Sequence, residues 1–268
     1  MVSRRVLAAA AGSLIALALA AVPARADEHI RLRIEVYGFA GIHVASSRVT
    51  IDEIGAQYAI AGDTETLGLA SIFSSFHGHS QTQGHLTANS AQPETYRADI
   101  RYDEAERHDR ADFRADGTIF GASTAPTGAA GNGSGAVALR GVLDPLTTYF
   151  SVERQLERGG NCTVTMPVFD GRHRYDLMFA DQGQQTLEPE NGQRYSGPAR
   201  LCHMRRADVA GYPTDRMELA RQGKLWYARL IPGDLFLPVR VEIETDGGDV
   251  TGYLTEVEGG GTSIKLMP

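Results

Sequence analysis

The sequence predicts a mostly β protein with one main helix. Apolar and charged residues alternate from Ile30 to Val36, which is typical of a strand with one buried face. Further strand-like segments follow at short intervals, separated by turn residues, as in an antiparallel meander. Only the segment 144–159 combines helix start and stop signals with apolar residues on one side. We therefore expect one β-rich domain over residues 27–258 rather than two smaller domains.

The N-terminal segment, residues 1–26, has the features of a removable secretory signal peptide. Arg4 and Arg5 form a basic start, 6–22 is almost unbroken small and apolar sequence, and 24–26 reads Ala-Arg-Ala. This order favours a signal peptide with an A-x-A cleavage site over a retained membrane anchor. We expect a periplasmic protein, exported by either the general or the twin-arginine route, with no stable membrane insertion after cleavage.

The expected strands lie close together along the chain. A turn at 38–41 joins the first strand to a second one that runs from Val44 to Ile51. Further strand candidates are 57–64, 81–87, 95–102, 110–114, 224–230 and 239–245. A C-terminal hairpin is expected to turn at 246–249, and the glycines at 259–261 predict the start of a loose tail over 259–268.

The segment from Cys162 to Ala180 predicts one hairpin in detail. Asp170-Gly171 is a favoured sequence for a two-residue turn of type I′, and this turn gathers most apolar residues on one face. On that face, the register pairs Val168 with His173, Met166 with Tyr175, and Val164 with Leu177. The opposite face pairs Phe169 with Arg172, Pro167 with Arg174, and Thr165 with Asp176.

Two segments break the β pattern. In the first, Asp144 and Pro145 are favoured as N-cap and first helical residue, and the glycines at 159–160 end the helix. The second segment contains Leu69, Ile72, Phe73 and Phe76, which also recur at helical spacing. A helical turn or an irregular lid fits this segment equally well. The stretch 122–135 has almost no side chain able to pack, so we expect a flexible loop there.

Cys162 and Cys202 are the only cysteines. In an oxidising compartment, an isolated pair favours a disulfide over two free thiols, and neither cysteine belongs to a C-x-x-C motif. A disulfide between residues 40 positions apart reduces the entropy of the unfolded chain, which stabilises the fold by about 4 kcal/mol in the chain-entropy model. We therefore expect a structural disulfide.

The charge of the chain argues against nucleic acid and anionic lipid surfaces as partners. Removal of 1–26 takes away three arginines and no acid, which leaves 23 basic residues against 33 acidic residues and a formal net charge of −10. Lys224 and Lys265 are the only lysines. The predominance of arginine fits fixed ion pairs, but it is no evidence for a phosphate site.

Four blocks in fixed order give the chain a resemblance to a known family. They are 144–146 (Asp-Pro-Leu), 168–177 (Val-Phe-Asp-Gly-Arg-His-Arg-Tyr-Asp-Leu), 195–199 (Tyr-Ser-Gly-Pro-Ala) with Cys202, and 237–240 (Leu-Pro-Val-Arg). In this order they resemble the domain-of-unknown-function 3108 family of exported bacterial proteins, from about Arg33 to Glu258. The resemblance implies a periplasmic, β-rich single domain without assigned catalytic residues. By a looser analogy, it implies a curved antiparallel sheet or open half-barrel wrapped around one main helix, similar to periplasmic lipoprotein carriers.

Few residues point to catalysis or metal binding. His77, His79 and His85 would share one strand face, but no carboxylate completes a known metal motif, so we expect surface histidines and no metal or other cofactor. Common hydrolase and nucleotide-binding motifs are absent from the sequence, and we assign no catalytic residue. Arg172, Arg174 and Asp176 are better explained by ion pairs than by a polar site.

Three classes of function remain after these exclusions. The first is a carrier whose curved sheet holds a hydrophobic small molecule or lipid; the second is a cell-envelope scaffold whose concavity its own helix fills; the third is an enzyme without a familiar motif. A carrier should retain a pocket of roughly 300 Å³ or more, whereas a filled core leaves voids near the size of one water molecule. The ligand-binding candidates are large apolar residues of the two irregular segments: Leu69, Ile72, Phe73, Phe76, Leu146, Tyr149 and Phe150.

Overall fold

The structure is a computed structural model that describes residues 27–68, 71, 75–123, 140–209, 221–231, 236–244 and 248–267. The expected signal peptide over 1–26 lies outside the described residues, as does 124–135 of the expected flexible loop. Three of the ligand-binding candidates, Leu69, Ile72 and Phe73, also lie outside them.

The described strands form one antiparallel sheet, which confirms the predicted mostly β fold. Along the sheet the strands follow the order β7-β6-β5-β4-β3-β2-β1-β13-β12-β11-β10-β9-β8, and β14 pairs with β13. Every strand predicted from the sequence is present, although the observed strands end one or two residues before the predicted segments 81–87, 110–114, 224–230 and 239–245 do. The strands are β1 (Glu28–Tyr37), β2 (His43–Ile54), β3 (Gln57–Thr66), β4 (Phe76–Leu86), β5 (Ala91–Tyr102), β6 (Ala105–Phe113), β7 (Ile119–Ala122), β8 (Val164–Phe169), β9 (Arg174–Leu187), β10 (Gly197–Asp208), β11 (Gln222–Arg229), β12 (Phe236–Ile243), β13 (Val250–Gly259) and β14 (Thr262–Lys265).

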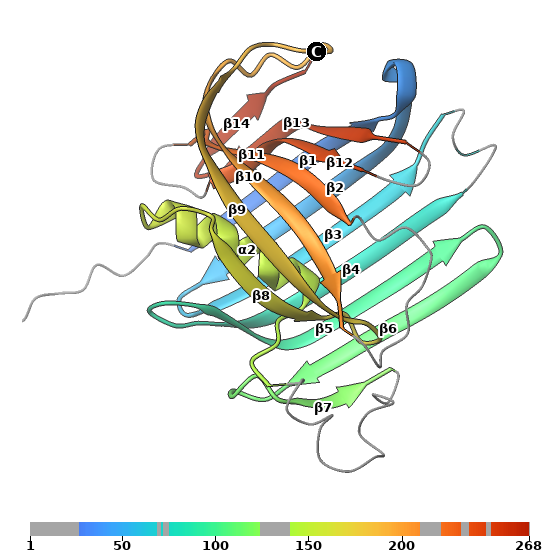
Figure 1. Cartoon of the computed structure of the whole chain (residues 1–268), viewed down its shortest axis with the longest axis vertical. Helices are drawn as coiled ribbons and strands as arrows, with labels where there is room; N and C mark the ends of the chain where they lie inside the picture. Colours follow the sequence, from blue (N-terminus) through green and yellow to red (C-terminus); the bar gives the residue numbers. More distant parts are fainter. Residues whose placement is uncertain are drawn as a thin grey trace, which may run out of the picture.

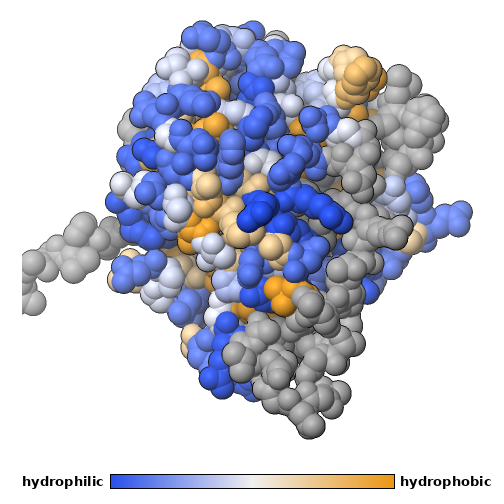
Figure 2. All heavy atoms as spheres, in the orientation of Figure 1, coloured by the Kyte–Doolittle hydropathy of each residue, from blue (hydrophilic) through white to orange (hydrophobic). Residues whose placement is uncertain are grey.

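The sheet curves around one helix, α2 (Pro145–Glu157), as an open half-barrel. Figure 1 shows the long strands β9 and β10 arching past the helix, with β1 to β6 on its other side. A single 3-10 turn at Phe39–Gly41 lies between β1 and β2. The face in Figure 2 is mainly hydrophilic, with small separate apolar areas, as expected when the apolar face of the sheet turns inward. No helix among the described residues is long and apolar enough to cross a membrane.

The start of α2 is held by a buried cap. Asp144 accepts hydrogen bonds from the backbone N–H of Thr147 at 3.0 Å and from its hydroxyl at 2.5 Å. The same carboxylate accepts from the hydroxyl of Thr82 on β4 at 2.9 Å, and the hydroxyls of Thr147 and Tyr58 on β3 lie 2.8 Å apart. The predicted N-cap is therefore confirmed, and it also joins the helix to the sheet.

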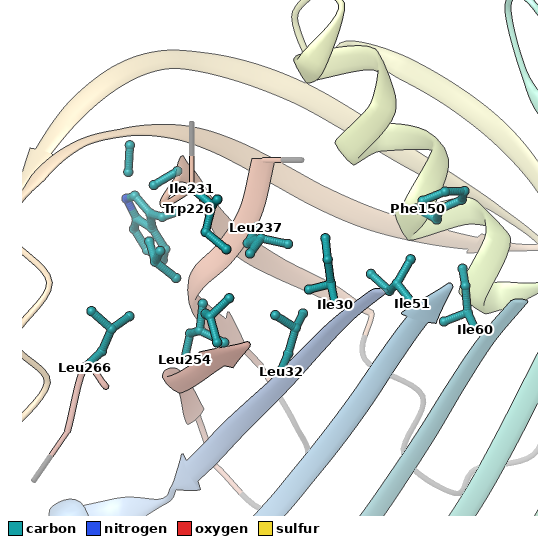
Figure 3. Close-up of a cluster of buried hydrophobic side chains, with 14 of the residues drawn as sticks. Ile30, Leu32, Ile51, Ile60, Phe150, Trp226, Ile231, Leu237, Leu254 and Leu266 are labelled. Atoms are coloured by element: carbon teal, nitrogen blue, oxygen red, sulfur yellow. The ribbon is translucent and has the colours of Figure 1, made fainter. Parts of the chain in front are cut away.

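The apolar core lies between α2 and the sheet. Phe150 on the helix is 1% exposed and packs with the fully buried Ile30 and Leu254 in one cluster. Figure 3 shows Leu32, Ile51 and other side chains of the first strands on the same side of the sheet as Phe150. A second cluster joins Val152 and Leu156 of the helix to the strands β8 to β11. Both faces of the helix therefore contribute to the core.

The β8–β9 hairpin forms as predicted, but its predicted register is wrong by two residues. Val168 pairs with Tyr175 rather than with His173, and Met166 pairs with Leu177 rather than with Tyr175. The cause is the carboxylate of Asp170, which accepts from the backbone N–H groups of Arg172 at 3.0 Å and His173 at 2.7 Å and so builds a longer turn. A two-residue shift leaves each side chain on the same face of the sheet.

This turn reaches across to β6, near the other edge of the sheet. A Cβ atom on Gly171 would lie 2.7 Å from the backbone of Arg110, and Gly171 has a φ of +93°, so glycine suits the position on both grounds. The Arg172 guanidinium donates to Asp109 on β6 at 3.3 Å. Phe169 packs in a third cluster with Phe113 of β6. These contacts bring the two ends of the open sheet together.

The C-terminal segment differs from the loose tail expected over 259–268. Thr262–Lys265 forms β14 and pairs with β13, and Leu266 is buried in the core. Gly260 and Gly261 have φ values of +54° and +74°, so the glycine run makes a tight turn between two strands. The expected hairpin between β12 and β13 is present, and it pairs Ile243 with Val250.

The predicted disulfide between Cys162 and Cys202 is confirmed. The two Cα atoms lie 6.1 Å apart, and both residues are fully buried. The bond links the segment between α2 and β8 to β10. It therefore restrains the exit of the helix against the arching strands.

The pair between Arg154 and Glu53 yields a test of helix docking. The Arg154 guanidinium on α2 donates to both carboxylate oxygens of Glu53 on β2, at 3.0 and 2.9 Å, and both side chains are buried. Arg154→Met should lower the free energy of unfolding by about 3–5 kcal/mol, because Glu53 loses this guanidinium inside the protein. Urea unfolding followed by circular dichroism measures the change.

Two comparisons accompany this measurement. Replacing both partners, Glu53→Leu with Arg154→Met, should restore most of the lost stability, because neither charge of this pair then remains. Arg101→Met, which removes an exposed pair with Glu106, should cost less than about 1 kcal/mol. Equal costs for the two single Arg→Met variants would contradict the docking role.

Candidate functional site

An apolar pocket lies between α2 and the curved sheet. Its volume is about 230 Å³. That is smaller than the roughly 300 Å³ that we expected of a carrier, but far larger than the ~10–15 Å³ that one water molecule needs. The lining side chains come from five strands and one face of the helix: Leu32, Ile34, Val49, Ile51, Ile60, Leu146, Tyr149, Phe150, Glu153, Leu225, Tyr227, Pro238, Val241 and Ile243.

The exposure of the lining residues shows where the pocket meets solvent. Ile60 of β3, Phe150 and Tyr227 are buried, whereas Ile34 and Ile243 are partly exposed. The pocket therefore runs from the surface near the partly exposed side chains to a buried inner end. A hydrocarbon chain can enter such a site and contact the aliphatic lining residues along its length.

The structure brings together three of the seven predicted ligand-binding residues. Leu146, Tyr149 and Phe150 follow one face of α2 and line the pocket. Phe76 is described at the start of β4, but it does not line this pocket, and its ring lies against Gly78. The remaining candidates of that segment lie outside the described residues.

Sequence reasoning missed Glu153, the acidic residue of the same helix face. Leu146, Tyr149, Phe150 and Glu153 follow the i, i+3, i+4, i+7 spacing of one helix face, so the apolar period itself points to position 153. Glu153 is 6% exposed. Burial raises the pKa of its carboxyl to about 8. At neutral pH this carboxyl is therefore mostly protonated and uncharged.

Glu153 differs from the other buried polar residues of α2. Thr147, Thr148 and Arg154 each have hydrogen-bond partners. Within the described part of the chain, Glu153 has neither a hydrogen-bond nor an ion-pair partner, and burial is the one cause that raises its pKa. Since buried polar groups are normally paired, this carboxyl is an exception that requires an explanation.

Two tyrosines on the same pocket add hydroxyl groups. Tyr227 of β11 is fully buried, and its hydroxyl has no hydrogen-bond partner among the described residues. Burial, followed by the charge of Glu153, raises the pKa of Tyr227 well above its ordinary value. Burial also raises the pKa of Tyr149 to about 12. Both phenols therefore keep their protons and can donate hydrogen bonds.

Several other residues weighed in the sequence form ion pairs. Arg172 pairs with Asp109, and Arg174 pairs with Asp176 at 2.7 Å. The histidines of β4 are spread along one strand, where His79 pairs with Asp63 and His85 pairs with Glu94. Among the described residues, no group of three or more His, Cys, Asp or Glu side chains is arranged to hold a metal ion.

A larger pocket of about 340 Å³ lies on the other side of α2, but its cations are already engaged. Arg154 binds Glu53, Arg158 donates to the carbonyl of Asn89 at 3.3 Å, and Arg114 lies over the Phe120 ring. The smaller apolar pocket is the stronger candidate, because it combines apolar walls with polar groups that lack partners.

The raised pKa of Glu153 predicts how stability depends on pH. Between its ordinary pKa of 4.5 and its folded value of about 8, the folded chain holds a proton that the unfolded chain has released. Stability from this group therefore falls as pH rises through that window. Glu153→Gln removes this titration. At pH 8 the free energy of unfolding of the variant, measured by urea unfolding, should therefore exceed that of the original chain by a few kcal/mol. At pH 4.5 the gain should largely disappear, and an equal difference at both pH values would refute the buried carboxyl.

Comparisons with known proteins give a family and two distant structural likenesses. The family model described as Protein of unknown function (DUF3108) matches residues 33–255. No curated protein matches the chain. One similar solved structure is a beta-barrel-like protein of domain of unknown function DUF1849 from Brucella abortus, with a TM-score of 0.47 and 12% identity over 88% of this chain and 98% of that chain.

A second similar structure is a candidate lipoprotein from Parabacteroides distasonis. Its TM-score is 0.35 and its identity is 10%, over 87% of this chain and 95% of that chain. The family match covers most of the chain and includes all four sequence blocks that carried the resemblance. This chain therefore belongs to the DUF3108 family of proteins of unknown function.

Proposed function

We propose that this protein binds an apolar small molecule or lipid chain in the pocket between α2 and the sheet, without catalysing a reaction on it. The observation that carries the proposal is a 230 Å³ pocket with apolar walls between the helix and the sheet. Packed cores leave few voids larger than a water molecule, so a pocket of this size needs a reason. Each ligand methylene buried there would contribute about 0.8 kcal/mol.

The proposal places this activity in the periplasm. Residues 1–26 have the order of a signal peptide, and an exported chain passes into a compartment that oxidises thiols. The buried disulfide between Cys162 and Cys202 is compatible with such a compartment. A ligand carrier between two membranes would need a site that shields an apolar chain from water, and this pocket meets that need.

A scaffold without a ligand is the second candidate function. The pocket is smaller than the roughly 300 Å³ typical of small-molecule sites, and side chains of α2 pack against both halves of the sheet. In that case partner proteins would bind the outer surface, and the pocket would be a tolerated packing defect. Direct binding measurements separate the two functions.

A pocket-filling substitution tests the proposed function. Ile34 lines the pocket and is partly exposed, so Ile34→Phe should add volume at its wall without leaving a cavity. We expect the original chain to bind a fluorescent fatty-acyl probe saturably and Ile34→Phe to bind it about tenfold more weakly, as expected when two methylenes lose their place.

Ile42→Phe provides the matched control. Ile42 is 47% exposed and lies outside the pocket, so this variant should bind the probe like the original chain. Thermal unfolding of all three proteins verifies that they are folded. Absence of saturable binding by the original chain, or equal loss in the two variants, would favour the scaffold.

A further inference from the structure

The buried end of the apolar pocket holds two proton-bearing groups without acceptors. Glu153 of α2 and Tyr227 of β11 both line the pocket. The Tyr227 hydroxyl has no hydrogen-bond partner in the described ranges, and the Glu153 carboxyl has none there either. Each is more than nine-tenths buried, with exposed fractions of 6% and 0%. Polar groups without a partner inside a protein are unfavourable, so a hydrogen-bond partner supplied by a ligand would be favoured.

The chemistry of these groups selects what that partner is. A protonated carboxyl and a phenol both donate hydrogen bonds, so the missing element is an acceptor oxygen. The charges that act on Glu153 supply no competing cation: burial is the cause of its raised pKa, and the neighbouring Arg154 points to Glu53. A charged ligand would have to leave water and enter an apolar pocket, which is costly even when it is paired.

We propose that Glu153 and Tyr227 form a recognition site for the uncharged carbonyl group of an acyl chain, such as an ester or an amide, whose hydrocarbon part occupies the apolar pocket. This inference rests on the proposed function and specifies its ligand class. The two donors bind the carbonyl oxygen, and the aliphatic walls of β1, β2 and β12 contact the chain. Neither group reacts with the ligand.

A comparison of four ligands with the same type of chain tests the proposal. Methyl octanoate is the ester, and undecane is a hydrocarbon with the same number of non-hydrogen atoms. Octylammonium is a cation and octanoate an anion, each with an eight-carbon chain. Dissociation constants come from displacement of the fluorescent acyl probe at pH 7. The variants are Glu153→Leu, Glu153→Gln and Tyr227→Phe, with Tyr195→Phe as the matched control, because the Tyr195 hydroxyl donates to the Pro198 carbonyl outside the pocket.

The expected result is specific to the ester. Methyl octanoate should bind about tenfold more weakly to Glu153→Leu and several-fold more weakly to Tyr227→Phe, because each variant removes a buried donor. Glu153→Gln should bind the ester with nearly the original affinity, because the glutamine amide still donates a hydrogen bond. The dissociation constant of undecane should stay within a few-fold of its value for the original chain in all variants. Tyr195→Phe should change the dissociation constant of neither ligand.

Other outcomes overturn the inference in distinguishable ways. Tight octylammonium binding that Glu153→Gln abolishes would assign Glu153 to a cation instead, and tight octanoate binding would assign the site to an acid. Saturable binding of ester and undecane with no effect of Glu153→Leu would leave the apolar pocket intact and remove the carbonyl site. Failure of every ligand to bind the original chain would remove the proposed function itself.

Discussion

The curvature of the sheet creates an apolar concave face, and this face is removed from water only because α2 lies against it. Phe150 reaches the first strands from one side of the helix, while Val152 and Leu156 reach the arching strands from the other. Since burial of apolar surface is the main favourable contribution to folding, the position of α2 determines how the two halves of the sheet pack. The pocket exists because the helix does not fill the concavity completely.

A helix inside a half-barrel must also satisfy its polar groups without water. Asp144 does this at the first turn through Thr147 and Thr82, and Arg154 does it near the last turn through Glu53. These two anchors hold α2 at both ends, so its middle presents one face to the pocket at a defined depth. Glu153 lies on that face without a partner among the described residues, which makes it the group most informative about function.

The helix and its cap could be predicted because Asp144, Pro145 and the following apolar spacing are local signals. The hairpin register could not, since the Asp170 carboxylate builds a longer turn than the Asp-Gly pair alone indicates. The glycines before β14 looked like the start of a loose tail, yet pairing with β13 orders the segment that follows them. Local patterns therefore predict elements better than the contacts that those elements make.

The residues of the candidate site also differ in how far the sequence alone could predict them. Leu146, Tyr149 and Phe150 were predictable from helical spacing and line the pocket. Glu153 fits the same spacing, but an acidic residue on a helix is ordinarily solvent-exposed. Only its packing beside strands more than 70 residues later in the chain, where Leu225 and Tyr227 lie, places it inside. That information depends on tertiary contacts, which a single sequence does not display.

Native mass spectrometry of the full chain, purified from exporting cells without detergent, tests the central claim most directly. If the cavity beside α2 is a binding site, the folded protein should carry a fraction heavier by the mass of one apolar molecule, which denaturation releases for identification. Filling the pocket with Ile34→Phe should remove that fraction. A folded protein whose mass equals that of the mature polypeptide alone, under conditions that retain a known lipid on a control carrier, would contradict the account.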